Sequence, residues 1–94
     1  MKDLKKIKVE YYNIPDDALP QTRWLLNIMN NYNVNCAEIG RKIHVARQTV
    51  RNWVHGYQTL SFPTICALVY IFDKAADPEK LYQLFNNPQQ EQSL

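Results

Sequence analysis

Hydrophobic residues recur at helical spacing in five successive segments of the chain, and polar or turn-forming residues separate the segments. The segments are Pro20 to about Tyr32, about Cys36–Ile43, about Ala46–His55, the stripe that follows Ser61 and ends at Phe72, and the stretch from Pro78 to the Asn-Asn-Pro at 86–88. This pattern predicts an all-α fold, one compact five-helix domain over residues 20–87.

Each predicted helix has an apolar face that is a candidate for the core. The faces outside the central pair of helices consist of Trp24, Leu25, Ile28, Met29 and Tyr32 in the first helix, Ile65, Leu68, Val69 and Phe72 in the fourth, and Leu81, Leu84 and Phe85 in the fifth. Because such stripes are usually core rather than a ligand pocket, we expect them to pack together.

The central pair of helices predicts a helix-turn-helix. Asn35 and Glu38 form the pattern of a capping box at the start of the second helix. Apolar residues are spaced so that two helices packed at a steep angle would bury them: Ile39, Ile43, Val45, Val50 and Trp53. The same packing leaves polar residues facing outward from the third helix: Arg47, Gln48, Thr49, Arg51 and Asn52.

Residues 1–19 and 88–94 flank the predicted domain. Ile7, Val9 and Tyr11 alternate with polar residues, which is strand-like periodicity. A short strand, an arm that follows a groove, and a partly disordered leader all remain open for residues 1–19. The Gln-rich segment 88–94 is expected to be a disordered tail.

The distribution of charge along the chain is more informative about partners than the net charge. A formal net charge of +2 in 94 residues does not by itself indicate a nucleic-acid partner. Residues 36–57, however, carry four basic side chains against Glu38 alone, a balance of +3, whereas residues 58–94 carry −2. The positive charge therefore lies on the predicted helix-turn-helix, where neutralisation of DNA phosphates would require it.

The two cysteines favour a cytoplasmic protein without a metal site. Cys36 and Cys66 lie thirty positions apart, and neither has nearby cysteine or histidine partners at metal-ligand spacing. We expect small, half-buried, reduced thiols, which suit the cytoplasm. No apolar run is long enough for a signal peptide or a membrane span, and no cofactor or small-molecule ligand is evident.

The outward side chains of the third helix have the chemistry that reads DNA. Glutamine and asparagine can pair with adenine through two hydrogen bonds, arginine can pair with guanine, and the Thr49 methyl can touch a thymine methyl. Asn35 and the first backbone N–H groups of the second helix offer a phosphate site. Arg41 and Lys42 add long-range attraction to the DNA backbone.

The segment NCAEIGRKIHVARQTVRNWVHG, residues 35–56, resembles the helix-turn-helix of the Cro and phage-repressor superfamily. Gly40 occupies the family's small position in the second helix, between the apolar residues already named. The resemblance continues through WVHGYQTLSFPTICAL and covers roughly Trp24 to Phe72. Two departures are His44 in place of the usual turn glycine, which would require left-handed backbone geometry at His44, and Ala46 in place of a hydroxyl cap. Gly40 instead of alanine also costs about 1 kcal/mol of helix propensity.

That resemblance implies a sequence-specific transcriptional regulator of phage or mobile-element origin, without enzymatic activity. It would bind double-stranded DNA as a homodimer whose half-sites lie about 34 Å apart. The implied base contacts are Arg47, Gln48 and Asn52, with Thr49 and Arg51 beside them; the expected backbone contacts are Asn35, Cys36, Arg41, Lys42 and His55.

Two other classes of function compete with this interpretation. An enzyme is disfavoured, because the histidines, cysteines and Asp16-Asp17 form no nucleophile–base, metal-ligand or phosphate-loop spacing. A protein-interaction module (an antitoxin, inhibitor or anti-activator) is the stronger alternative. Tyrosines distributed along the chain could supply its surface: Tyr11, Tyr12, Tyr57, Tyr70 and Tyr82.

Overall fold

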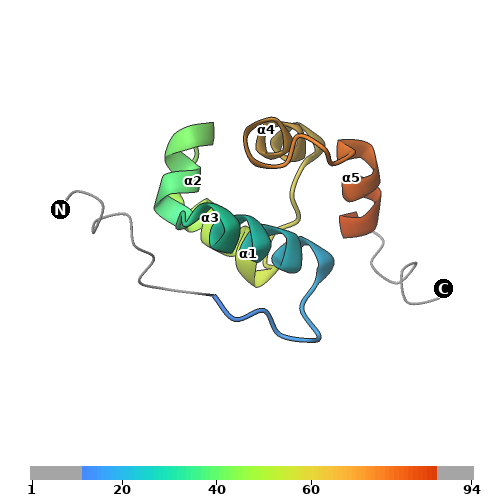
Figure 1. Ribbon diagram of the computed structural model, residues 1–94, viewed down its shortest axis with the longest axis horizontal. Helices are drawn as coiled ribbons and strands as arrows, with labels where there is room; N and C mark the ends of the chain where they lie inside the picture. Colours follow the sequence, from blue (N-terminus) through green and yellow to red (C-terminus); the bar gives the residue numbers. More distant parts are fainter. Residues whose placement is uncertain (1–11, 87–94) are drawn as a thin grey trace.

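The computed structural model describes residues 12–86, which form five α-helices joined by short connections (Figure 1). The helices are α1 (Pro20–Tyr32), α2 (Cys36–Ile43), α3 (Arg47–His55), α4 (Phe62–Phe72) and α5 (Pro78–Asn86). The predicted all-α, five-helix fold is confirmed. The predictions for residues 1–11 and 87–94 lie outside the described residues.

The helix ends follow the local chemistry of the sequence. Asn35 and Glu38 form the expected capping box: Glu38 N donates to Asn35 Oδ1 over 2.9 Å, and Asn35 N donates to Glu38 Oε1 over 2.8 Å. Ser61 caps α4 through Thr64 N, and Asp77 accepts a hydrogen bond from Glu79 N at the start of α5. These caps satisfy N–H groups that a helix leaves without partners at its start.

The core receives buried side chains from all five helices and from Leu60, between α3 and α4. Its fully buried side chains are Leu25, Met29, Ile39, Val50, Leu60, Ile65 and Leu68. The predicted faces of α1 and α4 point inward except for Tyr32, which is 52% exposed. That part of the prediction was wrong, because Tyr32 ends α1 and its ring packs edge-on against Phe72 from the outside, with 5.3 Å between ring centroids.

The arrangement places α2 and α5 at opposite ends of α1, while α4 is seen nearly end-on (Figure 1). Of the predicted face of α5 only Phe85 is buried, and Leu81 and Leu84 are half-buried. Trp24 joins α1 to this end of the core: its Nε1 donates to Asp73 Oδ2 over 2.9 Å, and its ring lies 5.6 Å from that of Phe85. Within residues 12–86, no helix combines the length and the apolar character needed to cross a bilayer.

Candidate nucleic-acid interface

The turn between α2 and α3 is built on a left-handed residue and a close approach of two backbones. His44 has φ 64° and ψ 45°, the left-handed geometry expected for a residue in the usual glycine position. Val45 N donates to Gly40 O over 2.9 Å. A Cβ at position 40 would lie 2.5 Å from Val45 O, which is too close for any side chain. Gly40 is therefore required by the turn, a reason that helix propensity does not reveal.

The inner side of α3 is fixed by packing. Val50 and Trp53 are buried, and Ile43 and Val45 pack against them from α2 and the turn, as predicted. The helix begins at Arg47, one residue later than predicted, because Ala46 has extended backbone geometry and takes the N-cap position. Ala46 provides no side-chain cap, in agreement with the sequence.

Two side chains from α1 hold the carboxyl end of α3 in place. Gln21 is only 4% exposed, and its Nε2 donates to Trp53 O over 2.8 Å. Thr22 Oγ1 donates to Val54 O over 2.6 Å. The last carbonyl groups of a helix have no partner within it, so these contacts satisfy them and fix the position of α3 against α1.

Gln21 also fixes the loop that follows α3. Its Nε2 donates to Gln58 O over 2.7 Å, and its Oε1 accepts a longer hydrogen bond, 3.4 Å, from Leu60 N. Gln21 was not among the predicted site residues. A glutamine in the first turn of an amphipathic helix normally faces solvent, and nothing in its neighbourhood indicates that its partners lie more than thirty residues away.

The outer side of α3 is polar and accessible. Arg47, Gln48, Arg51 and His55 are exposed, whereas Thr49 and Asn52 are half-buried. Two hydrogen bonds run along this surface: Gln48 Nε2 donates to Asn52 Oδ1 over 3.1 Å, and Asn52 Nδ2 donates to Gln58 Oε1 over 3.0 Å. Gln58 was not among the predicted site residues, because it lies beyond the helix-turn-helix.

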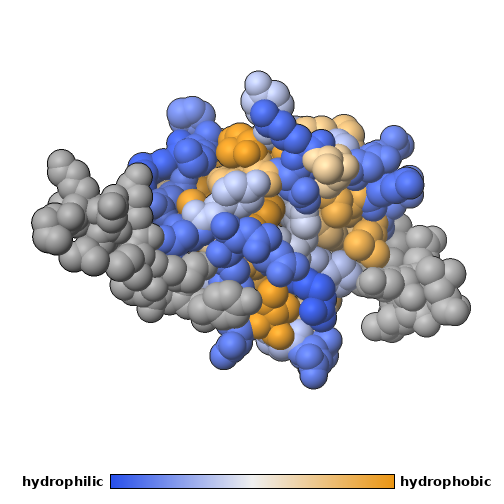
Figure 2. All heavy atoms as spheres, viewed as in Figure 1, coloured by the Kyte–Doolittle hydropathy of each residue, from blue (hydrophilic) through white to orange (hydrophobic). Residues whose placement is uncertain are grey.

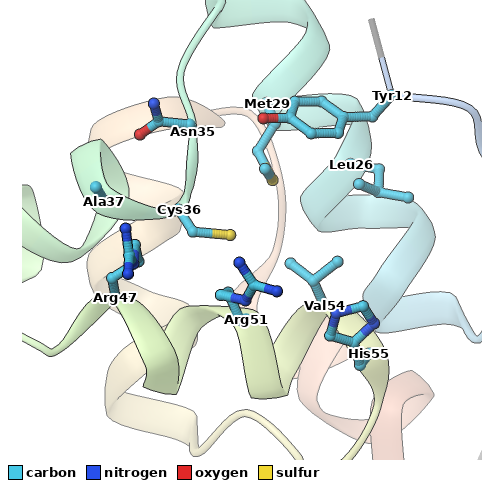
Figure 3. A pocket seen from close by; sticks show the side chains of 10 residues that line it. All are labelled: Tyr12, Leu26, Met29, Asn35, Cys36, Ala37, Arg47, Arg51, Val54 and His55. Atoms are coloured by element: carbon cyan, nitrogen blue, oxygen red, sulfur yellow. The ribbon is translucent and has the colours of Figure 1, made fainter. Parts of the chain in front are cut away.

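Five of the predicted contact residues surround one hollow of about 410 Å³, which is seen from close by in Figure 3. They are Asn35, Cys36, Arg47, Arg51 and His55. The thiol of Cys36 and the side chain of Arg51 project into the hollow from α2 and α3, and the rings and methyl groups of Tyr12, Met29 and Leu26 form the wall on the side of α1. The remaining predicted residues do not line this hollow.

The hollow combines positive charge with unused hydrogen-bond donors. In the capping box, Glu38 N and Ile39 N are engaged by Asn35, and no residue among 12–86 accepts from the backbone N–H groups of Cys36 and Ala37. Such groups at a helix start attract anions. Burial raises the pKa of the Cys36 thiol, and the nearby guanidinium groups act in the opposite direction, Arg51 more than Arg47. The thiol therefore stays neutral beside this positive surface at neutral pH.

Arg41 and Lys42 are exposed in the last turn of α2, at the other end of that helix from the hollow. They are therefore not brought together with the other predicted backbone contacts. A cation in the last turn interacts favourably with the helix dipole, which gives these two residues a structural role.

The chain leading into α1 is tied down beside the hollow. Asn30 pairs with the backbone of Tyr12 through two hydrogen bonds: Tyr12 N donates to Asn30 Oδ1 over 2.8 Å, and Asn30 Nδ2 donates to Tyr12 O over 2.9 Å. Tyr12 and Ile14 pack against the core. The described part of the predicted arm is therefore fixed to α1 without forming a helix or a strand of its own.

Cys36 and Cys66 are free, half-buried thiols, as predicted. Among residues 12–86, no three His, Cys, Asp or Glu side chains are grouped so that they could hold a metal ion. Comparison with known proteins finds no matching family model, no match among curated proteins and no match among solved structures.

Proposed function

We propose that this protein is a sequence-specific DNA-binding transcriptional regulator of the Cro/repressor type, with α3 in the major groove of its operator. The observation that carries the proposal is the division of α3 into two sides. Val50 and Trp53 lock one side into the core, and the other presents exposed arginine and glutamine side chains beside the start of α2. A recognition helix needs a rigid inner side and hydrogen-bonding groups with access to base edges.

The side chains divide into two roles by their position. Gln48 and Asn52 have the amide groups that pair with adenine, and Arg47 and Arg51 have the guanidinium groups that pair with guanine or with phosphate. Thr49 is half-buried and offers its methyl group at most. The backbone N–H groups of Cys36 and Ala37, with Asn35 and His55 near them, would hold a phosphate, and Arg41 and Lys42 would attract the duplex from farther away.

A homodimer is part of the proposal. One α3 reads only a few base pairs, and two copies related by a two-fold axis would read half-sites about 34 Å apart on one face of the duplex.

The proposal is tested by selecting from random DNA duplexes at near-physiological salt and titrating the selected duplexes with salt. The double variant Gln48→Ala/Arg51→Ala should lose the selected preference while keeping its fold. Gln83→Ala/Lys80→Ala is the matched control, because it removes one exposed amide and one exposed cation from α5 instead. A selected pseudo-palindrome supports the dimer. Persistence of the preference in the α3 variant would refute the assignment of α3.

A second candidate function rests on exposed aromatic rings outside α3, although one of them, Tyr57, stacks on His55 at the end of that helix with 5.5 Å between ring centroids. Tyr57 and Tyr70 are 76% and 73% exposed, and Phe62 and Tyr82, which pack against each other, are 41% and 39% exposed. Hydrophobic residues also reach the surface over α4 and α5 (Figure 2). Exposed tyrosines favour protein interfaces. If the selection recovers no duplex at all, this surface and a protein partner become the better hypothesis.

A further inference from the structure

We propose that Gln58 is a positioning residue that orders the amides of Asn52 and Gln48, and that Gln48 thereby reads adenine in preference to guanine. This inference rests on the proposed DNA-binding function. It concerns a residue outside the helix-turn-helix and assigns it a role in specificity rather than in contact with DNA.

The main chain of Gln58 is held in place by hydrogen bonds. Its backbone carbonyl accepts from the buried Gln21 over 2.7 Å, and its backbone N–H donates to Asn52 O over 3.4 Å. The neighbouring Tyr57 N donates to the same oxygen over 2.8 Å. The Gln58 side chain therefore extends from a point that the core holds in place, although the side chain itself is exposed.

The side-chain amides of Gln58, Asn52 and Gln48 form a hydrogen-bonded row. Gln58 Oε1 accepts from Asn52 Nδ2 over 3.0 Å, and Asn52 Oδ1 accepts from Gln48 Nε2 over 3.1 Å. Polar contacts thus run without interruption from the buried Gln21 to the exposed Gln48. An isolated glutamine on a helix surface samples many rotamers and both orientations of its amide, and this row restricts both.

The row of amides limits which polar atoms of Gln48 remain available to a base. A glutamine amide has two N–H donors and one carbonyl acceptor. One N–H of Gln48 is engaged by Asn52, so one donor and the acceptor remain. Adenine presents one acceptor and one donor in the major groove, whereas guanine presents two acceptors. The ordered Gln48 therefore matches adenine, and it can no longer supply two donors to guanine.

Two variants of Gln58 separate positioning from direct contact. Gln58→Leu removes the acceptor that holds Asn52 while keeping a side chain of similar size. Gln58→Glu keeps an acceptor for Asn52 Nδ2 but adds a negative charge near the DNA phosphates. Neither change touches the main-chain hydrogen bonds at position 58, so both variants should fold. Gln83→Leu on α5 is the matched control, because Gln83 is exposed and no residue of 12–86 bonds to its amide.

The A·T pair that Gln48 reads is first identified as the position at which Gln48→Ala loses its preference. The experiment then compares the affinity for the selected duplex with the affinity for a version in which this pair is changed to G·C. Gln58→Leu should reduce the discrimination between the duplexes about two- to tenfold, the factor expected when one side chain must be ordered on binding. Gln58→Glu should bind both duplexes more weakly and keep the wild-type discrimination. Gln83→Leu should behave as the wild type.

Unchanged discrimination in Gln58→Leu, or an equal loss of affinity for both duplexes, would overturn the inference. Wild-type protein without any sequence preference would instead refute the proposed function. A measurement without DNA separates the two failures. In NMR spectra of the free protein, the side-chain amides of Gln48 and Asn52 should be less mobile than that of Gln83, and Gln58→Leu should release them. Equal mobility in the wild type would show that the row does not order these amides.

Discussion

Gly40→Ala should destabilise the fold, although alanine is the better helix former. The position lies in the middle of α2, where replacing glycine with alanine normally stabilises by about 1 kcal/mol. Here the new Cβ would lie 2.5 Å from Val45 O, and real Cβ atoms stay beyond 3.0 Å, so the turn must open by about 0.5 Å. The obstacle is a backbone atom, so no change of rotamer can relieve it.

The size of the effect follows from the two opposing contributions. Inserting a methyl group where the surroundings must move costs about 1–3 kcal/mol, and the rigid backbone favours the upper half of that range. After the gain in helix propensity, the free energy of unfolding should fall by about 1–2 kcal/mol. For a domain of this size that lowers Tm by about 5–15 °C.

Chemical denaturation followed by circular dichroism measures this change. The pair Arg41→Ala and Arg41→Gly provides the control at the neighbouring exposed position, where alanine should be the more stable by about 1 kcal/mol. If Gly40→Ala is as stable as the wild type while the Arg41 pair behaves as expected, then the turn is not in close contact with α2 and the reasoning fails. If the reasoning holds, the variant should also lose affinity for DNA, because the angle between α2 and α3 changes.

Three further predictions concern the supports of the candidate interface. Gln21→Ala should lower the free energy of unfolding by about 2–3 kcal/mol in urea denaturation, because it removes the partner of Gln58 O and Leu60 N and leaves Trp53 O only its bond from Gly56 N. Gln83→Ala should change it by less than about 0.5 kcal/mol. His44→Gly should raise the free energy of unfolding by about 0.5–1 kcal/mol, because glycine adopts left-handed backbone geometry without the steric cost that a side chain brings. An unchanged or lower Tm would contradict this. Burial raises the pKa of the Cys36 thiol, so its alkylation by iodoacetamide, measured in the Cys66→Ser variant, should be slower at pH 8 than that of a free thiol. Alkylation of Cys36 should accelerate as higher pH forms the thiolate, and rapid alkylation at pH 7 would argue against the burial.

The fold could be predicted because its information is local. Each helix carries an apolar stripe, and the start of α2 is specified by two residues of one capping box, Asn35 and Glu38. His44 could be assigned its left-handed geometry because it stands where the resemblance places the turn glycine. Tyr32 shows the limit of this reasoning: its spacing places it on the inner stripe, but the helix ends at it, so its ring reaches the core only from outside.

The candidate interface was less predictable, because its supports depend on distant parts of the chain. The types of the side chains on α3 could be read directly, and their exposure follows from the apolar residues opposite them. The need for glycine at position 40 depends on how closely the turn returns to α2, which spacing along the chain does not show. The hydrogen bonds from Gln21 to Trp53 O and Gln58 O join segments more than thirty residues apart.

Gly40, Gln21 and Thr22 set the position of α3 rather than form it. Val50 and Trp53 determine which side of α3 faces the core, but apolar packing alone allows small rotations and shifts along the helix axis. Hydrogen bonds are directional, and those from Gln21 and Thr22 reach consecutive carbonyl groups, Trp53 O and Val54 O, at one end of α3. Two fixed points at that end restrict both movements. Changes in these polar supports should therefore alter the presentation of the outer side of α3 more than they alter the fold, which makes them places where specificity can change while the five-helix core persists.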